Sequence, residues 1–134
     1  MYKYFIIFFV LLVFNSCDYT SETKLGGDFT IWEHDVSQTR NLYYRSQGIG
    51  PSPICNVGYD DKYIWVRLCK EKDGITNYLV NRKSYAKNPN QRESDGYWEF
   101  YSGADFVNKM SEFGITFKEV GWKKNYDNPY IKSK

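Results

Sequence analysis

The chain has 134 residues, of which 18 are Lys or Arg and 16 are Asp or Glu, so its formal net charge is +2. A near-neutral chain of this length has room for one domain with its own core, and it lacks the basic excess typical of proteins that bind nucleic acid. Its aromatic share of 19% favours a sheet-rich fold, because aromatic side chains suit half-buried pleated surfaces.

The first 16 residues have the pattern of an export signal. Lys3 precedes an almost unbroken apolar run from Tyr4 to Phe14, roughly half of the ~20 residues that a transmembrane helix needs. The next residues, Phe14-Asn15-Ser16-Cys17, resemble the lipobox of bacterial lipoproteins. This resemblance implies a signal peptide over residues 1–16 and fatty acylation, of the palmitate type, at Cys17. An ordinary cleaved signal and an uncleaved anchor helix are the alternatives.

Cleavage before Cys17 leaves 118 residues with 17 basic and 16 acidic side chains. Several acyl chains on Cys17 make an essentially permanent anchor. We therefore expect a protein tied by lipid to a bacterial membrane, in the cell envelope, facing outside the cytoplasm on the periplasmic or surface side. Small, polar and charged residues over 17–27 predict a flexible tether. A globular domain over 28–122 and a loose polar tail over 123–134 follow.

Alternating and aromatic-rich runs predict a series of antiparallel strands. The expected strands are residues 29–33, 41–45, 54–59, 63–70, 75–81, 97–101 and 115–122. Residues 54–59 and 63–70 flank the acidic turn Asp60-Asp61-Lys62, a pattern typical of a β-hairpin. Residues 47–53 and 87–96 are rich in Gly, Pro or polar side chains and predict surface loops.

The second strand of this hairpin has two different faces. One face carries Ile64, Val66 and Leu68, and the other carries Tyr63, Trp65, Arg67 and Cys69. We expect the aliphatic face to meet the core, while the aromatic face is either covered by a helix or partly open.

One short amphipathic helix is expected after residue 102. Ser102-Gly103-Ala104-Asp105 fits a capping box, and Gly114 is the expected left-handed stop. Phe106, Val107, Met110 and Phe113 follow at helical spacing. The fold class is therefore a single α+β domain, with one antiparallel sheet of about five or six of these strands and this helix packed on it.

Cysteine usage agrees with lipidation. With Cys17 in a thioether, Cys55 and Cys69 remain as an even pair in an oxidising compartment. They lie near the open end of the hairpin and become cross-strand neighbours if the turn register or a bulge at Gly58 aligns them. A disulfide and two buried free thiols are both open.

The segment from Val57 to Ile115 resembles a group of small bacterial lipoproteins known only as a domain of unknown function. The matching stretches are Gly58-Tyr59-Asp60-Asp61-Lys62-Tyr63-Ile64, Tyr78-Leu79-Val80, Gly103-Ala104-Asp105-Phe106 and Phe113-Gly114-Ile115. The resemblance implies a small, exported and lipid-anchored protein, and it brings no activity and no functional residues.

Catalytic and metal-binding patterns are weak in this sequence. His34 is the one histidine, and its neighbours Glu33 and Asp35 point to the opposite face of a strand, so the three cannot converge on one metal or substrate. Asp60 and Asp61 suit a hairpin turn for backbone reasons alone. We therefore expect no enzyme activity, no cofactor and no bound metal.

The residues Tyr63, Trp65 and Arg67 could form a binding face for a protein or glycan, joined by Tyr43, Tyr59 or Tyr78 from neighbouring strands. The alternative is that Trp65 lies beneath the helix against Phe106 or Met110. The leading hypothesis is a non-enzymatic envelope protein that acts by binding. Two other classes stay open. An inhibitor or immunity-type protein predicts a rigid projecting loop, for which 47–53 is the better candidate and 87–96 the worse. A small hydrolase predicts a cavity with at least two convergent ionisable groups.

Overall fold

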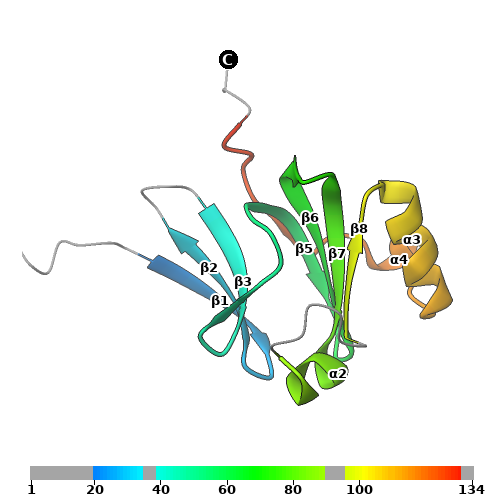
Figure 1. Cartoon of the computed structure of the whole chain (residues 1–134), viewed down its shortest axis with the longest axis horizontal. Coiled ribbons are helices and arrows are strands. Elements are labelled where there is room, and N and C mark those ends of the chain that lie inside the picture. Colours follow the sequence, from blue (N-terminus) through cyan, green and yellow to red (C-terminus); the bar gives the residue numbers. More distant parts are fainter. Residues whose placement is uncertain (1–19, 35–38, 90–95, 131–134) are drawn as a thin grey trace, which may run out of the picture.

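The protein is described here from a computed structural model, which covers residues 20–34, 39–89 and 96–130 (Figure 1). The export signal, Cys17, Asp35 and most of the 87–96 segment lie outside the described residues. The strands are β1 Thr20–Gly26, β2 Phe29–His34, β3 Thr39–Tyr44, β4 Gln47–Ile49, β5 Ile54–Tyr59, β6 Tyr63–Lys72, β7 Ile75–Asn81, β8 Tyr97–Phe100 and β9 Lys124–Asn125. The helices are α2 Arg82–Lys87, α3 Gly103–Glu112 and α4 Phe117–Val120.

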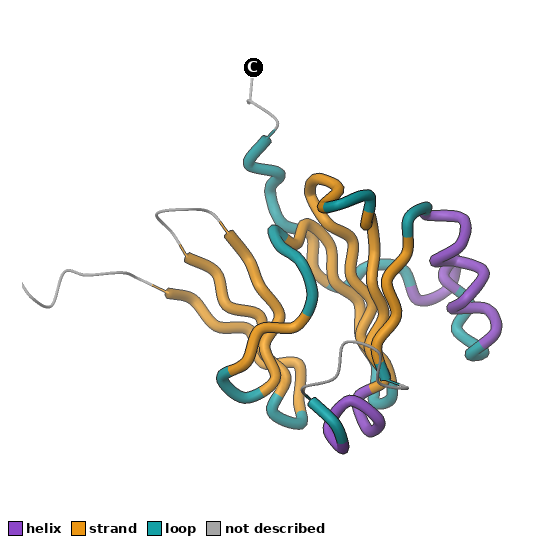
Figure 2. Tube along the Cα trace, in the orientation of Figure 1, coloured by secondary structure: helices purple, strands orange, loops and turns teal. Residues whose placement is uncertain are grey.

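The described strands form two antiparallel sheets. One has the order β1-β2-β3-β4, and the other has the order β8-β7-β6-β5-β9. Figure 2 shows the sheets facing each other, with α3 and α4 on the outer side of the second sheet. The prediction of antiparallel strands with a helix packed on a sheet is confirmed, but the expectation of a single sheet with one helix is wrong. Two sheets form because the chain crosses between them after β4, which lets the apolar faces of both cover each other.

The main core lies between the two sheets. Ile31 and Leu42 from the first sheet, and Ile64, Val66 and Tyr78 from the second, are at most 1% exposed. The aliphatic face of β6 therefore meets the core as predicted. The expected β5–β6 hairpin and the β7 strand are also confirmed.

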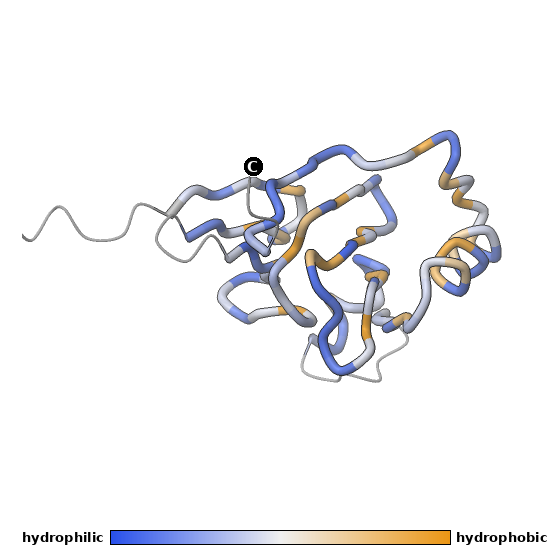
Figure 3. The backbone as a smooth tube through the Cα atoms, turned by 90° about the horizontal axis from the view of Figure 1, so that it is seen from above, coloured by the Kyte–Doolittle hydropathy of each residue, from blue (hydrophilic) through white to orange (hydrophobic). Residues whose placement is uncertain are grey.

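A second core separates the second sheet from α3 and α4. Trp65 and Leu79 on the sheet pack with Phe106 and Met110 of α3. The serine half of the predicted capping box is confirmed, since the Ser102 hydroxyl accepts from the Asp105 main-chain N–H at 3.2 Å. Among the described residues, the Asp105 carboxylate makes no hydrogen bond back to Ser102. Figure 3 shows hydrophobic and hydrophilic residues alternating around the helical turns, as expected of a helix that covers a sheet.

Residues 20–26, assigned from the sequence to a flexible tether, form the edge strand β1, so the tether prediction is wrong for this segment. β1 pairs along its length with β2. Leu25 is 4% exposed in the main core, whereas Glu22 and Lys24 are exposed. One apolar residue among polar ones gives almost no periodic signal, so the strand is visible only once its partner is placed.

The predicted strand over 115–122 is also wrong. Gly114, at φ +74°, ends α3, Ile115 is buried, and Phe117–Val120 forms the single turn α4. Phe117 and Trp122 both contact the ring of Phe106, with centroids about 6 Å away. A short apolar run fits either a period of two or a helical turn, and this second core decides the outcome.

The polar tail is not loose over its described part. Lys124–Asn125 forms β9 beside β5, and the Tyr126 main-chain N–H donates to the Cys55 carbonyl oxygen at 2.7 Å. Polar side chains and main-chain groups hold this segment, and such contacts leave no hydrophobic pattern. The domain therefore extends past residue 122 and begins before residue 28.

Candidate functional site

The predicted binding face on β6 is not an open surface. Trp65 is 1% exposed beneath α3, and its Nε1 donates to the carbonyl oxygen of Gly121 at 2.9 Å. Tyr63 stacks on Phe113 with ring centroids 5.2 Å apart. The interpretation of this strand face as a binding surface is therefore wrong for Trp65, and the alternative that it lies under the helix is confirmed.

The other residues of that face are dispersed. Arg67 is exposed, but its Nε donates to the Asn56 side chain at 2.7 Å. Of the expected neighbours, Tyr78 is buried between the sheets, Tyr59 packs against the same core, and Tyr43 belongs to the first sheet. The structure does not bring these residues together.

The acidic candidates Glu33 and Asp60 stabilise the fold, and the single histidine does not converge with them. Glu33 accepts from the Nε of buried Arg40 at 3.1 Å, while His34 ends β2 on the other face. The Asp60 carboxylate accepts from the main-chain N–H groups of Lys62 and Tyr63 at 2.8 and 2.7 Å, the turn role predicted for it. Among the described residues, no group of three His, Cys, Asp or Glu side chains is placed to hold a metal ion.

Cys55 and Cys69 are joined by a disulfide, with their Cα atoms 4.8 Å apart. The register shift that brings them together lies between Ile54 and Asn56, and not at Gly58. Gly58 has a different role, since a Cβ there would overlap the Trp65 indole at its Nε1. The absence of a side chain at position 58 makes room for the indole.

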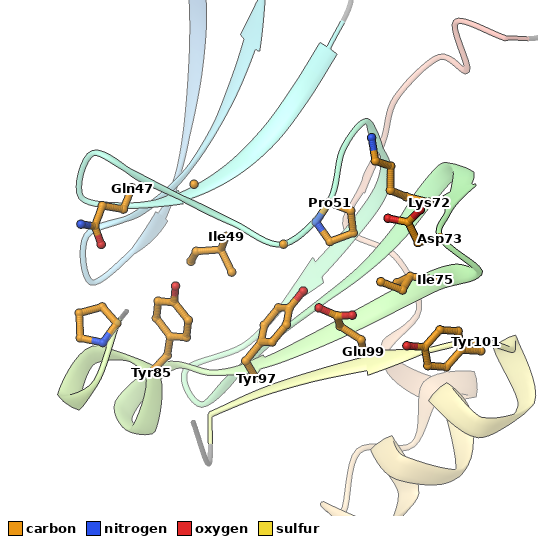
Figure 4. Close-up of a pocket in the computed structure, with 13 residues that line it drawn as sticks. Gln47, Ile49, Pro51, Lys72, Asp73, Ile75, Tyr85, Tyr97, Glu99 and Tyr101 are labelled. Carbon is orange, nitrogen blue, oxygen red and sulfur yellow. The ribbon is translucent and has the colours of Figure 1, made fainter. Parts of the chain in front are cut away.

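A cavity of about 640 Å³ opens where an edge strand of each sheet comes near the other, β4 on one side and β8 on the opposite side (Figure 4). Its lining comes from β4 and the crossing segment, from the β6–β7 turn with its flanking strand residues, from α2 and Pro89 beyond it, and from β8 and Tyr101. The lining residues are Gln47, Gly48, Ile49, Gly50, Pro51, Lys72, Asp73, Ile75, Tyr85, Pro89, Tyr97, Glu99 and Tyr101.

The inner wall of this cavity is buried and aromatic. Tyr85 and Tyr97 are 6% and 7% exposed, and the Tyr78 hydroxyl behind them donates to the Ile49 carbonyl oxygen at 3.3 Å. Gly50, at φ +65°, lies so close that a Cβ would sit 2.8 Å from the Tyr97 hydroxyl oxygen. Burial raises the pKa of Tyr78 well above its ordinary value, with Tyr97 and Tyr85 adding to the effect, and burial also raises the pKa of Tyr85.

Residues 47–51 line this cavity, and the segment 47–53 is fixed to the domain at two buried positions. Gln47–Ile49 is strand β4, Ile49 is 2% exposed, and Pro53 is buried. The prediction of a surface loop is therefore wrong for residues 47–49. For the inhibitor hypothesis, the better candidate loop is thus partly a strand, while most of the other candidate, 87–96, lies outside the described residues.

Three side chains that carry a charge at neutral pH line the cavity: Lys72, Asp73 and Glu99. Within the described part of the chain, none of the three has a side-chain hydrogen bond or an ion pair. Figure 4 shows Glu99 directed into the space between Tyr97 and Tyr101, while Lys72 extends away from it. The cavity can therefore present an uncompensated carboxylate between aromatic rings.

No motif in the sequence points to Glu99, but strand alternation could have found it. Over residues 97–101, Trp98 and Phe100 face the helices, so Tyr97, Glu99 and Tyr101 share the opposite face. What the sequence cannot show is that β4 faces this strand across a gap, because that depends on how the two sheets meet.

Comparisons of the chain with protein families, with curated proteins and with solved structures found no match. No helix within residues 20–34, 39–89 and 96–130 is long and apolar enough to cross a membrane.

Proposed function

We propose that this chain is a lipid-anchored protein of the bacterial cell envelope that faces outside the cytoplasm and acts by binding a protein or a glycan. The export pattern up to Cys17 and the resemblance of residues 57–115 to small bacterial lipoproteins support the location. The Cys55–Cys69 disulfide supports it too, because such bonds persist in oxidising compartments.

The observation that carries the binding function is the cavity between β4 and β8. Concave sites with aromatic walls and a few convergent polar groups are where ligands bind most often. Here Tyr85 and Tyr97 provide buried walls, while Glu99 provides a polar group without a protein partner among the described residues. Tyr101 is 65% exposed at the rim, where an amphipathic ring can cover a bound ligand.

The anchor is tested by metabolic labelling of growing bacteria with a fatty-acid analogue. The expected result is label on the wild-type chain and none on Cys17→Ala. The Cys55→Ala, Cys69→Ala double variant is the matched control, because it also loses cysteine sulfur but keeps the lipidation position. Label retained on Cys17→Ala would refute this anchor site.

The binding function is tested by placing a photoreactive amino acid at Gln47, on the exposed rim of the cavity, in the membrane-anchored chain. Irradiation of intact cells should give a discrete crosslinked product. The same probe at Lys118, on α4 beyond the other face of the second sheet, should give none. Protease or glycosidase digestion of the product then shows whether the partner is a protein or a glycan.

A rim variant connects this product to the cavity. Tyr101→Ala should reduce the crosslink several-fold, whereas Tyr130→Ala, which removes a similarly exposed tyrosine elsewhere, should not. No crosslink from Gln47 under any growth condition, or equal yields from Gln47 and Lys118, would count against the proposal.

A small hydrolase is the second candidate, favoured by Asp73 and Glu99 lining one cavity. Paired carboxylates can serve as acid and base on either side of a scissile bond. This candidate requires that the purified protein change the mass of its captured partner over time and that Glu99→Gln stop the change. If the partner binds but its mass does not change, the hydrolase candidate is rejected and only the binding function remains.

A further inference from the structure

Glu99 is the charged side chain directed into the cavity that a ligand could neutralise. It is half-buried, and no described residue offers its side chain a hydrogen bond or a cation. A carboxylate in such a place gains most from a positive charge, because the surrounding protein weakens the competition from water. Lys72, on the rim, extends away from it (Figure 4).

The rings around Glu99 suit the same kind of ligand. Tyr97 lies on one side of Glu99 and Tyr101 on the other, and Tyr85 of α2 lies beyond Tyr97 (Figure 4). The face of a tyrosine ring attracts an ammonium or guanidinium group within about 6 Å of its centre. An anionic ligand would instead meet both Glu99 and Asp73 and be repelled.

In the described part of the chain, the free edge of β8 suggests that the positive group belongs to a peptide, as a Lys or Arg side chain. The Asn81 main-chain N–H donates to the Gly96 carbonyl oxygen at 2.8 Å. Hydrogen-bonded and non-hydrogen-bonded residue pairs alternate along an antiparallel ladder. Because Asn81 and Gly96 are a hydrogen-bonded pair, Tyr78 and Glu99 form a non-hydrogen-bonded pair. The main-chain N–H and C=O of Glu99 therefore point away from β7, toward the side where an added strand would pair.

We propose that the cavity binds an extended peptide segment, which pairs with the main chain of Glu99 and places a Lys or Arg side chain against the Glu99 carboxylate between Tyr97 and Tyr101. This proposal rests on the binding function proposed above and names the chemistry of the partner. A protein partner is favoured over a glycan because the strand edge offers hydrogen bonds that match a peptide backbone.

The test is a nuclear magnetic resonance titration of the folded domain, with residue 17 and the preceding signal removed, using the probe acetyl-Thr-Val-Lys-Val-Thr-amide. The same peptide with Arg, norleucine or Glu at its centre gives the comparison series. Lys and Arg peptides should bind at least about tenfold more tightly than the norleucine peptide, in line with a charge-assisted hydrogen bond. The shifts should be largest at Glu99 and Tyr101.

The variant Glu99→Gln should remove the preference for Lys and Arg over norleucine. Glu119→Gln, the same change on α4, should leave it intact. An unchanged amide spectrum shows that each variant is folded, and exposed or half-buried Glu→Gln changes are expected to keep the fold. Raising the salt concentration should lower the affinity for the Lys peptide more than the affinity for the norleucine peptide.

Several results would overturn the proposal. These are equal binding of the Lys and norleucine peptides, an undiminished preference in Glu99→Gln, or a glucosamine oligosaccharide that binds more tightly than the Lys peptide. If the Gln47 crosslink depends on Tyr101 while Glu99→Gln changes nothing, the binding function stands and the basic-peptide assignment fails. If no crosslink forms at all but the peptide series behaves as expected, the chemistry of the cavity stands without the cellular function.

Discussion

Arg40 donates from its Nη1 to the main-chain carbonyl oxygen of Asp127 at 2.8 Å, across 87 positions of the chain. The same guanidinium lies 4.7 Å from the ring centre of Tyr126 and pairs with Glu33. Arg40 is 5% exposed, so one buried side chain of the first sheet holds the C-terminal segment against the domain.

Substitution of Arg40 by Met should lower the free energy of unfolding by about 2 to 3 kcal/mol, because it leaves Glu33 partly buried without its cation. It should also release the segment around β9. Hydrogen exchange at the Tyr126 amide, which donates to Cys55, should accelerate. The control is Arg45→Met, whose exposed pair with Asp28 is expected to contribute less than about 1 kcal/mol. Equal effects of the two variants would contradict this account.

Gly58→Ala should destabilise the domain by about 1 to 3 kcal/mol, because the new methyl group overlaps the buried indole of Trp65. Chemical denaturation monitored by tryptophan fluorescence measures it. Gly103→Ala is the matched control, since a Cβ there meets nothing within 4 Å and alanine favours a helix. If Gly58→Ala were as stable as Gly103→Ala, the close packing of residue 58 on Trp65 would be refuted.

Alkylation of the unfolded protein without reductant should leave Cys55 and Cys69 unmodified. The Cys55→Ala, Cys69→Ala double variant should be less stable by about 2 to 4 kcal/mol, because the bond closes a short loop in the unfolded chain. Intact mass after alkylation and denaturant titration provide the two measurements. Quantitative labelling of both thiols in the untreated protein would rule out the bond.

Stability should fall above about pH 10. Burial raises the pKa of Tyr78, Tyr85 and Tyr126 in the folded protein, so the unfolded chain loses these protons first and rising pH favours unfolding. The stabilising effect of each neutral phenol is complete below the unfolded pKa and is lost as the pH rises toward the folded one. Tyr78→Phe should flatten this decline by up to about 1.4 kcal/mol per pH unit. Denaturation at several pH values, with and without this substitution, measures the slope, and an unchanged slope would contradict it.

Local patterns in the sequence predicted the centre of the second sheet and its helix. The β5–β6 hairpin, β7, the aliphatic face of β6 and the Ser102 cap follow from alternation, turn residues and capping chemistry, all of which act over a few neighbouring residues. The apolar stripe of α3 also favoured the burial of Trp65, because such a stripe packs against a sheet and Trp65 lies on the face that α3 covers.

Tertiary contacts alone decided the rest. β1 forms because it pairs with β2. α4 forms because Phe117 and Trp122 pack on Phe106. The segment around β9 is held by hydrogen bonds to Arg40 and Cys55. The cavity likewise depends on where β4 and β8 lie after the chain crosses between the sheets. The sequence by itself determined the local elements, because propensity and periodicity act within a segment. The second sheet and the candidate site arise from contacts between residues far apart in the chain, which only the folded structure brings together.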